Sequence, residues 1–172
     1  MSRALHVLLA VVMVSRAVFA QSGARPAPST VNQLMRGILF INSNVVFSAQ
    51  SDNPAEIPQD IQGSRAVNPL VGVFGGWQAI ENAALALVES ATLLEMPRPC
   101  SNGKPAPVKD AEWMKFVEEL RQVGMGAYKA GQAKSQDQIL DVSDRMAQMC
   151  AGCHGMYRDR NRDANGASRC VK

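Results

Sequence analysis

The stretch DQILDVSDRMAQMCAGCHGMYR, residues 137–158, joins a helical hydrophobic pattern to two cysteines and a histidine. Its apolar residues recur at every third or fourth position, as they do on the buried face of an amphipathic α-helix: Ile139, Val142, Met146 and Met149. The pattern runs directly into Cys150-Ala151-Gly152-Cys153-His154. The segment therefore predicts a helix that carries a cluster of ligand-forming side chains at its C-terminal end.

Three further amphipathic patterns lie earlier in the chain. The first spans residues 30–49 behind the capping residue Ser29 or Thr30, and its apolar positions are Val31, Leu34, Ile38, Ile41 and Val45. The second follows Gly75-Gly76 and ends near Met96, and its apolar positions are Trp77, Ile80, Ala84, Leu87, Ala91 and Leu94. The third precedes a break expected near residues 131–135, and its apolar positions are Trp113, Phe116, Val117, Leu120, Val123 and Ala127.

Four such helices predict an all-α fold, an antiparallel four-helix bundle over residues 30–160. The connections at 50–73 and 97–107 contain several prolines and glycines, which are typical of loops. The sequence has no alternating strand pattern of useful length and no internal repeat. Residues 21–29 are expected to form a flexible leader, and residues 161–172 a polar tail.

The first 20 residues have the features of a secretory signal peptide. Arg3 supplies the positive charge, Ala4–Val14 is an apolar run interrupted only by His6, and the small residues Val18 and Ala20 suit a cleavage site before Gln21. An uncleaved membrane anchor is the alternative, but the run is far shorter than the ~20 residues that a span requires. We therefore expect export to the periplasm, with no membrane span after cleavage.

The charge balance excludes one class of partner. The chain has 18 basic and 15 acidic residues, and cleavage would remove Arg3 and Arg16 and no acid, so the net charge falls from +3 to +1. Domains that bind nucleic acid normally carry a clear excess of basic residues, so we do not expect this chain to bind nucleic acid. A chain of this length also buries enough surface to fold without disulfides or a bound metal ion, so its four cysteines need another explanation.

The segment Cys150–His154 matches C-x-x-C-H, the attachment pattern of c-type haem. Two thiols three positions apart share one helix face and can add to the two vinyl groups of one haem c, while His154 binds its iron. Gly152 is expected to leave room for the porphyrin edge. The alternatives are a zinc site using Cys100, Cys150, Cys153 and Cys170, a thiol–disulfide site, which would need a βαβ context, and coincidence.

The number of histidines limits which side chains can bind the iron. The chain has two, and His6 would leave with the signal peptide, so His154 is the only one in the mature protein. Ligation by two histidines of one chain is then excluded. The sixth position is left to a methionine, another side chain, water or nothing.

The terminal segment CAGCHGMYR, residues 150–158, resembles the C-x-x-C-H-x-x-Tyr-Arg terminus of the class II c-type cytochromes, the cytochrome c′ group. The resemblance implies a four-helix bundle with haem near the end of the last helix. It implies that Tyr157 packs near His154, that Arg158 lies beside the proximal face of the haem or in solvent, and that a homodimer uses the first two helices. The chain departs from the pattern in its lengthened 97–107 connection and in the tail that carries Cys170.

In that family a residue early in the first helix covers the distal haem face. Here Met35 occupies such a place, and we expect it to be the sixth ligand. The alternative is that Met35 fills a gap in the core while Leu34 or Phe40 covers the haem, which would leave the iron five-coordinate.

Cys100 and Cys170 remain when the motif cysteines are assigned to haem, an even number in an oxidising compartment. In an up-down-up-down bundle the 97–107 connection and the C-terminal tail lie at the same end, which is the haem end. We therefore predict a Cys100–Cys170 disulfide that pins the tail over the haem edge. Free thiols and an intermolecular crosslink are the alternatives.

These features favour a monohaem, one-electron carrier that serves redox partner proteins. The alternatives are a five-coordinate protein that binds nitric oxide or carbon monoxide, and a haem subunit docked to a dehydrogenase. No catalytic pair stands out, so no enzymatic activity is predicted. Trp77 and Trp113 are expected in the core rather than as electron relays. The terminal basic residues either dock an acidic partner or are merely solvated: Arg158, Arg160, Arg162, Arg169 and Lys172.

Overall fold

The structure is a computed structural model that describes residues 27–59, 73–159 and Cys170. These residues form helices and loops without a strand, apart from one isolated bridge between Pro99 and Pro105. The all-α prediction is therefore confirmed for the described part of the chain. The predicted signal peptide at 1–20, most of the leader and most of the C-terminal tail lie outside it.

The first helical segment is continuous but changes its winding in the middle. It consists of α1 (Val31–Leu34), a π-helical turn η1 (Met35–Leu39), α2 (Phe40–Phe47) and a 3₁₀ turn η2 (Ser48–Gln50). Thr30 caps its start in a capping box with Gln33. The predicted extent of 30–49 is confirmed, whereas the π turn was not expected from the sequence.

The other three long helices also match their predicted patterns. They are α4 (Gly76–Glu95), α5 (Ala111–Ala133) and α6 (Gln136–His154), and a short 3₁₀ turn η3 (Pro54–Glu56) precedes α4. A second π-helical turn, η4 (Gly155–Asp159), continues α6. Asp110 and Ser135 cap the starts of α5 and α6 with their side-chain oxygens.

The break expected near residues 131–135 is confirmed, and it lies at the end of that range. The helix α5 includes Gly131 and ends at Ala133, Lys134 is in the left-handed conformation, and Ser135 caps α6. A Cβ at Gly131 would come within 2.8 Å of the Glu81 side chain on α4. The glycine is therefore explained by the close approach of two helices, not by a turn.

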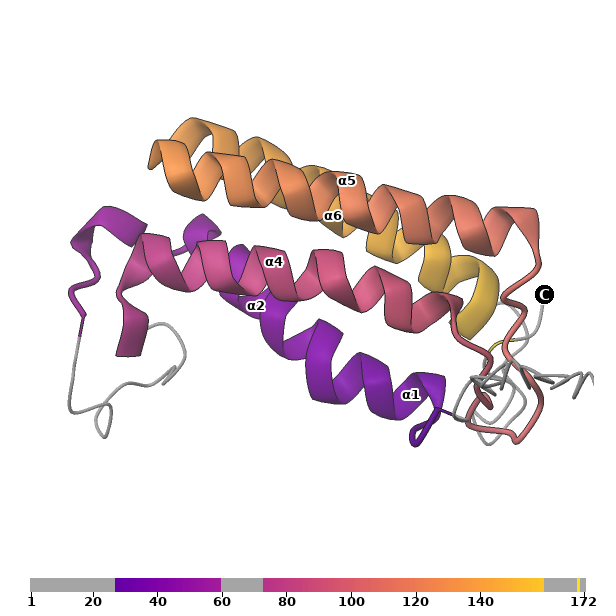
Figure 1. The fold of residues 1–172 in the computed structure, drawn as a ribbon. Helices are drawn as coiled ribbons and strands as arrows, with labels where there is room; N and C mark the ends of the chain where they lie inside the picture. The colour runs from indigo at the N-terminus through magenta and orange to yellow at the C-terminus, as the bar shows by residue number, and fades with distance from the viewer. Residues whose placement is uncertain (1–26, 60–72, 160–169, 171–172) are drawn as a thin grey trace, which may run out of the picture.

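The helices lie side by side in a bundle-like arrangement (Figure 1). The closest pairs are α4 with α5, α5 with α6, and α2 with α4. At one end the Val31 N–H donates to the Pro99 carbonyl at 2.9 Å, which ties the first helix to the 97–107 loop. At the other end the Gln136 side chain donates to the Ala49 carbonyl at 2.9 Å, which ties the end of the first helical segment to the start of α6.

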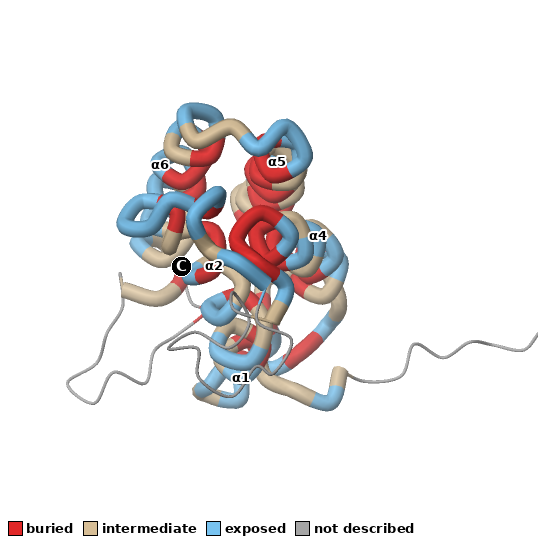
Figure 2. Tube along the Cα trace, turned by 90° about the vertical axis from the view of Figure 1, so that its left-hand side faces the viewer, coloured by how far each residue is buried: buried red, intermediate tan, exposed pale blue. Residues whose placement is uncertain are grey.

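The buried residues of the helices lie toward the inside of this arrangement, and the exposed residues lie toward its outside (Figure 2). Trp77 and Trp113 are both buried, with 9% and 3% of their surface exposed, and belong to the hydrophobic core. Within the described residues, no helix is long and apolar enough to cross a bilayer.

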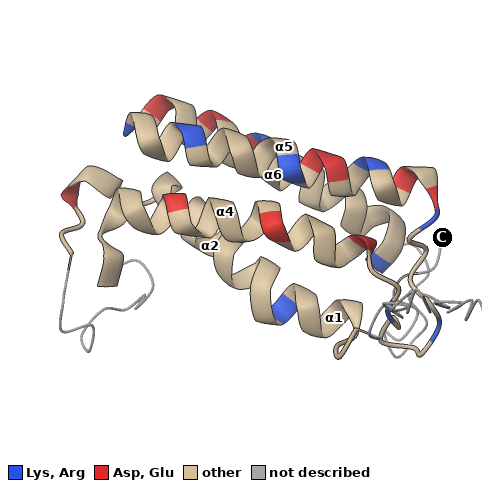
Figure 3. Ribbon diagram, in the orientation of Figure 1, with Lys and Arg blue, Asp and Glu red and all other residues tan. Residues whose placement is uncertain are grey.

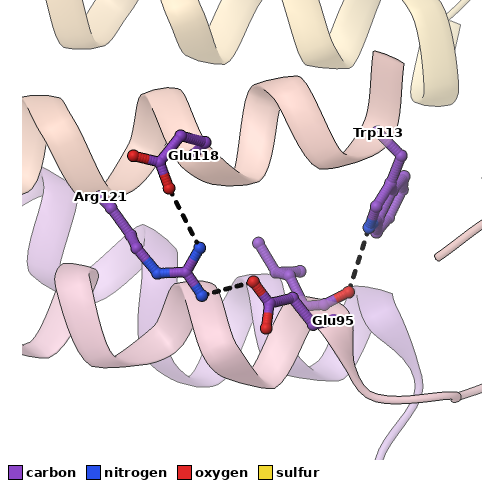
Figure 4. Close-up of polar contacts among 5 residues, drawn as sticks. Glu95, Trp113, Glu118 and Arg121 are labelled. Atoms are coloured by element: carbon purple, nitrogen blue, oxygen red, sulfur yellow. Dashed lines mark hydrogen bonds and ion pairs between the residues drawn. The ribbon is translucent and has the colours of Figure 1, made fainter. Parts of the chain in front are cut away.

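Charged residues are distributed unevenly over the helices (Figure 3). Arg36 is the only charged residue between Val31 and Gln50, while α5 carries both signs along its length. An ion-pair cluster links α4 to α5, because Arg121 contacts Glu95 on α4 and Glu118 on its own helix (Figure 4). Nearby, the Trp113 indole N–H donates to the Leu94 carbonyl at 3.1 Å.

Candidate cofactor site

A cavity of about 460 Å³ opens at the end of the helices where α1 begins and α6 ends. Its volume falls within the range of small-molecule and cofactor sites, which is roughly 300–1,000 Å³. Its walls come from the first helical segment, from α4, α5, α6 and η4, and from Ser101 and Cys170. The lining is mostly apolar, and its deep part includes Leu87, Val117, Leu120 and Met146.

All three residues of the C-x-x-C-H motif face this cavity. Cys150, Cys153 and His154 line it from the last turn of α6. Burial raises the pKa of the Cys150 thiol, and burial together with Cys150 and Glu119 raises that of Cys153 to about 12. Both thiols are therefore protonated at neutral pH, as expected for side chains in an apolar pocket.

Met35 lines the same cavity from a different element, the π turn η1. Of the two residues considered as alternative covers of the iron, Leu34 is buried in the core and does not line the cavity. Phe40 does line it, although 66% of its surface is exposed. A thioether and an aromatic ring thus share the wall that belongs to the first helix.

Both π-helical turns border the site. The turn η1 contributes Met35, Arg36 and Leu39 to the cavity, and η4 contributes Tyr157 and Arg158. Such turns are uncommon in proteins and are often found at functional sites. Neither turn has a sequence signature that would have revealed it.

Tyr157 fixes the turn that follows His154. Its side chain is buried, with 4% exposed, and its hydroxyl donates to Asp110 Oδ1 at 2.9 Å. Its ring meets Trp113 edge to face at a centroid distance of 5.1 Å. The pKa of the Tyr157 hydroxyl is raised, mainly by burial and to a smaller extent by the hydrogen bond to Asp110. Tyr157 thus connects η4 to the N-terminal cap of α5.

Arg158 lines the cavity but is engaged by its neighbour. Its Nε and Nη2 atoms donate to the two carboxylate oxygens of Asp159, each at 2.8 Å. Its side chain remains 41% exposed. The guanidinium therefore lies at the rim, partly in solvent.

Gly152 lies directly against Phe116 on α5. A Cβ at this position would approach the Phe116 ring to 3.0 Å, so the glycine lets this ring, which itself lines the cavity, pack closely on α6. The expectation that Gly152 leaves room for a porphyrin edge stays a prediction.

Cys100 and Cys170 lie at disulfide distance, with their Cα atoms 5.7 Å apart, as the sequence predicted. Both are buried, and the Cys170 N–H donates to the Tyr157 carbonyl. Cys170 itself lines the cavity, so the bridge fixes this residue at the site.

The same bridge uses two of the four cysteines that a zinc site would need. Within the described residues, no group of three or more His, Cys, Asp or Glu side chains is placed to hold a metal ion. The thiol–disulfide interpretation required a βαβ context, and the described helices supply none.

No family model, curated protein or solved structure matches this chain. The functional argument therefore depends on the residues of the cavity and their chemistry.

Proposed function

We propose that the chain is an exported, periplasmic monohaem c-type cytochrome that carries one electron between redox partner proteins. One observation carries the proposal: two thiols and an imidazole at the end of α6 open onto an apolar cavity of about 460 Å³, and a methionine thioether lines the same cavity from the first helix. This set of side chains suits a haem, since it offers two sites for vinyl addition and two candidate axial ligands on separate elements.

Each part of the site has a defined role in this proposal. A bound haem c supplies an iron centre that gains and loses one electron. Cys150 and Cys153 would hold it covalently, and His154 and Met35 would be the ligands of its iron. A thioether ligand stabilises the reduced iron and raises the potential. The apolar lining keeps water away from the iron and limits rearrangement during electron transfer.

Contacts at the cavity end of the molecule support the antiparallel bundle that is part of this proposal. The start of the first helix lies beside the 97–107 loop, and Cys170 lies beside both the loop and η4. The haem then sits at one end of the bundle, close to the surface, where a redox partner can approach. The exposed Phe40 and Ile41 on the first helix suit the homodimer contact that the family resemblance implies.

Mass spectrometry of the denatured mature protein tests the proposal. The mass should exceed that of the polypeptide by one haem, and a Cys150→Ala/Cys153→Ala variant should lack this addition. The haem of the wild type should also stay with the protein in acid–acetone. A wild-type protein with the polypeptide mass alone would refute the proposal.

Optical spectra decide between the electron carrier and a gas-binding protein. The ferric wild type should be low-spin with a weak near-infrared sulfur-to-iron band, and Met35→Leu should make it high-spin. Met146→Leu is the matched control, because Met146 lines the same cavity but is fully buried in the core. A wild type that is already high-spin at neutral pH would favour the five-coordinate alternative that binds nitric oxide or carbon monoxide.

A further inference from the structure

The π turn η1 gives the first helix one residue more than regular α-helical winding would hold. Here the Phe40 N–H donates to the Met35 carbonyl, five positions earlier, whereas an α-helix joins residues four positions apart. Gly37 lies in this turn and is exposed, and a Cβ there would meet no described atom within 4 Å outside its own turn. No close contact therefore requires the glycine, which is a weak helix former and tolerates irregular winding.

The extra residue decides which side chains face the cavity. Each residue of an α-helix is rotated by about 100° from the one before it. Continuing α1 without the π turn would put Ile38 and Ile41 together on the buried face, as their spacing in the sequence predicts. It would also turn Phe40 about 140° away from Met35. In the structure Ile41 is 40% exposed instead, and Phe40 lines the cavity together with Met35.

Both windings are compatible with the contacts that hold the two ends of the first helix. The Val31 N–H is bound to the Pro99 carbonyl, and the Ala49 carbonyl accepts from the Gln136 side chain, each at 2.9 Å. The extra residue can move along the helix between these contacts, because only the middle of the helix then rotates. Neither end has to be released.

Side-chain donors lie at the carbonyls where the winding would change. The Asn42 amide donates to the Ile38 carbonyl at 2.8 Å, and the Asn44 amide donates to the Phe40 carbonyl at 2.6 Å. Such bonds give a helical carbonyl a partner other than the backbone N–H of the next turn. The two carbonyls therefore keep a donor while the backbone hydrogen bonds are exchanged, which lowers the cost of moving the turn.

The side chains that would change places are both partly exposed. Phe40 already has 66% of its surface exposed, so turning it outward exposes only the smaller part of the side chain. Ile41, which is 40% exposed, would be turned inward and would bury a comparable apolar area. Because apolar burial stabilises in proportion to area, the two windings differ little in this contribution to the free energy.

We propose that η1 is a movable turn that controls entry to the cavity. A shift of the extra residue toward Asn44 turns the Phe40 ring out of the cavity wall, and the smaller Leu39 takes its place beside Met35. The mouth of the cavity then admits a small uncharged ligand from solution. The binding of that ligand at the iron rests on the proposed function, whereas the movement of the turn does not.

Deletion of Gly37 tests the proposal, with carbon monoxide as the probe ligand. The deletion removes the extra residue, so that Met35 and Phe40 are four positions apart and share one face of a regular α-helix. The ring then keeps its place, but the second winding is lost. Laser photolysis of the carbon monoxide complex of the reduced holoprotein measures entry, because the sixth position has just been vacated. Rebinding should be slower than in the wild type by about tenfold.

Two variants serve as controls for this measurement. Gly37→Ala keeps the number of residues, so its rebinding rate should stay within about twofold of the wild type. Phe40→Ala combined with the deletion should restore fast rebinding, because the ring that blocks entry is gone. Equal rates in the wild type and the deletion variant, or slow rebinding in the combined variant, would overturn the inference.

Hydrogen exchange of the wild-type holoprotein covers the case in which the deletion variant does not fold. Amides of residues 36–44 should exchange at least about tenfold faster than those of residues 113–127 in α5, because the turn exchanges its hydrogen bonds without unfolding of the bundle. Equal protection of the two segments would refute a movable turn. Absence of covalent haem from the mass spectrum would instead refute the proposed function, and the exchange experiment would still decide whether the turn moves.

Discussion

Replacing both Cys100 and Cys170 by alanine measures what the bridge contributes to stability. The two residues are 70 positions apart in the chain. A crosslink closing a loop of that length lowers the entropy of the unfolded chain by about 15 cal/mol/K, which is about 4 kcal/mol at 25 °C. For a domain of this size, such a loss lowers Tm by roughly 10–15 °C. Because both sulfur atoms are buried, lost packing adds to this cost rather than offsetting it.

Thermal and urea unfolding of the wild type and the double variant, each with one haem, provide the comparison. Adding a reductant to the unfolded wild type should remove the difference, and adding it to the variant should change nothing. Non-reducing peptide mapping should find the Cys100 and Cys170 peptides joined. A stability difference below about 1 kcal/mol, or two thiols that can be alkylated in the native protein, would refute the reasoning.

Two further predictions concern contacts around the site and the bundle. Tyr157→Phe should lower stability at pH 7 by about 1–2 kcal/mol, because it leaves Asp110 without one of its donors. Because the pKa of Tyr157 is raised in the folded protein, its stabilising effect is complete below the ordinary value of 10.0 and is lost as the pH rises above it. The free energy of unfolding of the wild type, measured with urea, should therefore fall more steeply above that pH than that of Tyr157→Phe. Gly76→Ala should destabilise by about 2–3 kcal/mol, since its Cβ would lie 2.1 Å from the Pro54 carbonyl oxygen, whereas Gly37→Ala, with nothing within 4 Å, should be neutral or stabilising in the same thermal scans. An equal response of the two glycine variants would show that the close approach of Pro54 does not limit this position.

The long helices could be predicted because their apolar residues recur with the helical period and, for the first of them, because a capping residue marks its start. Thr30, Asp110 and Ser135 each cap a helix whose buried face had been assigned from spacing alone. The disulfide followed from topology, since the order of four helices brings the 97–107 loop and the tail to the same end.

Other features depend on packing that a single sequence does not contain. Gly131 and Gly152 each allow a neighbouring helix to approach closely, and the sequence alone did not indicate either contact. The burial of Arg98 gave no signal at all, because an arginine between two prolines in a loop is normally solvated. It is buried here because the loop folds back onto Ser29 and Val31.

The two walls of the cavity differ in how they are held. The wall that carries His154 is fastened by the bond from Tyr157 to Asp110, by the aromatic contact with Trp113 and by the hydrogen bond from Cys170. The opposite wall, the first helix, is tied at its start through Val31 and near its end through Ala49. Between these points lies the π turn with Met35, which packs on α4 through apolar contacts. In the proposed haem site, a change of the sixth iron ligand would therefore be accommodated more easily by movement of the first helix than by movement of α6.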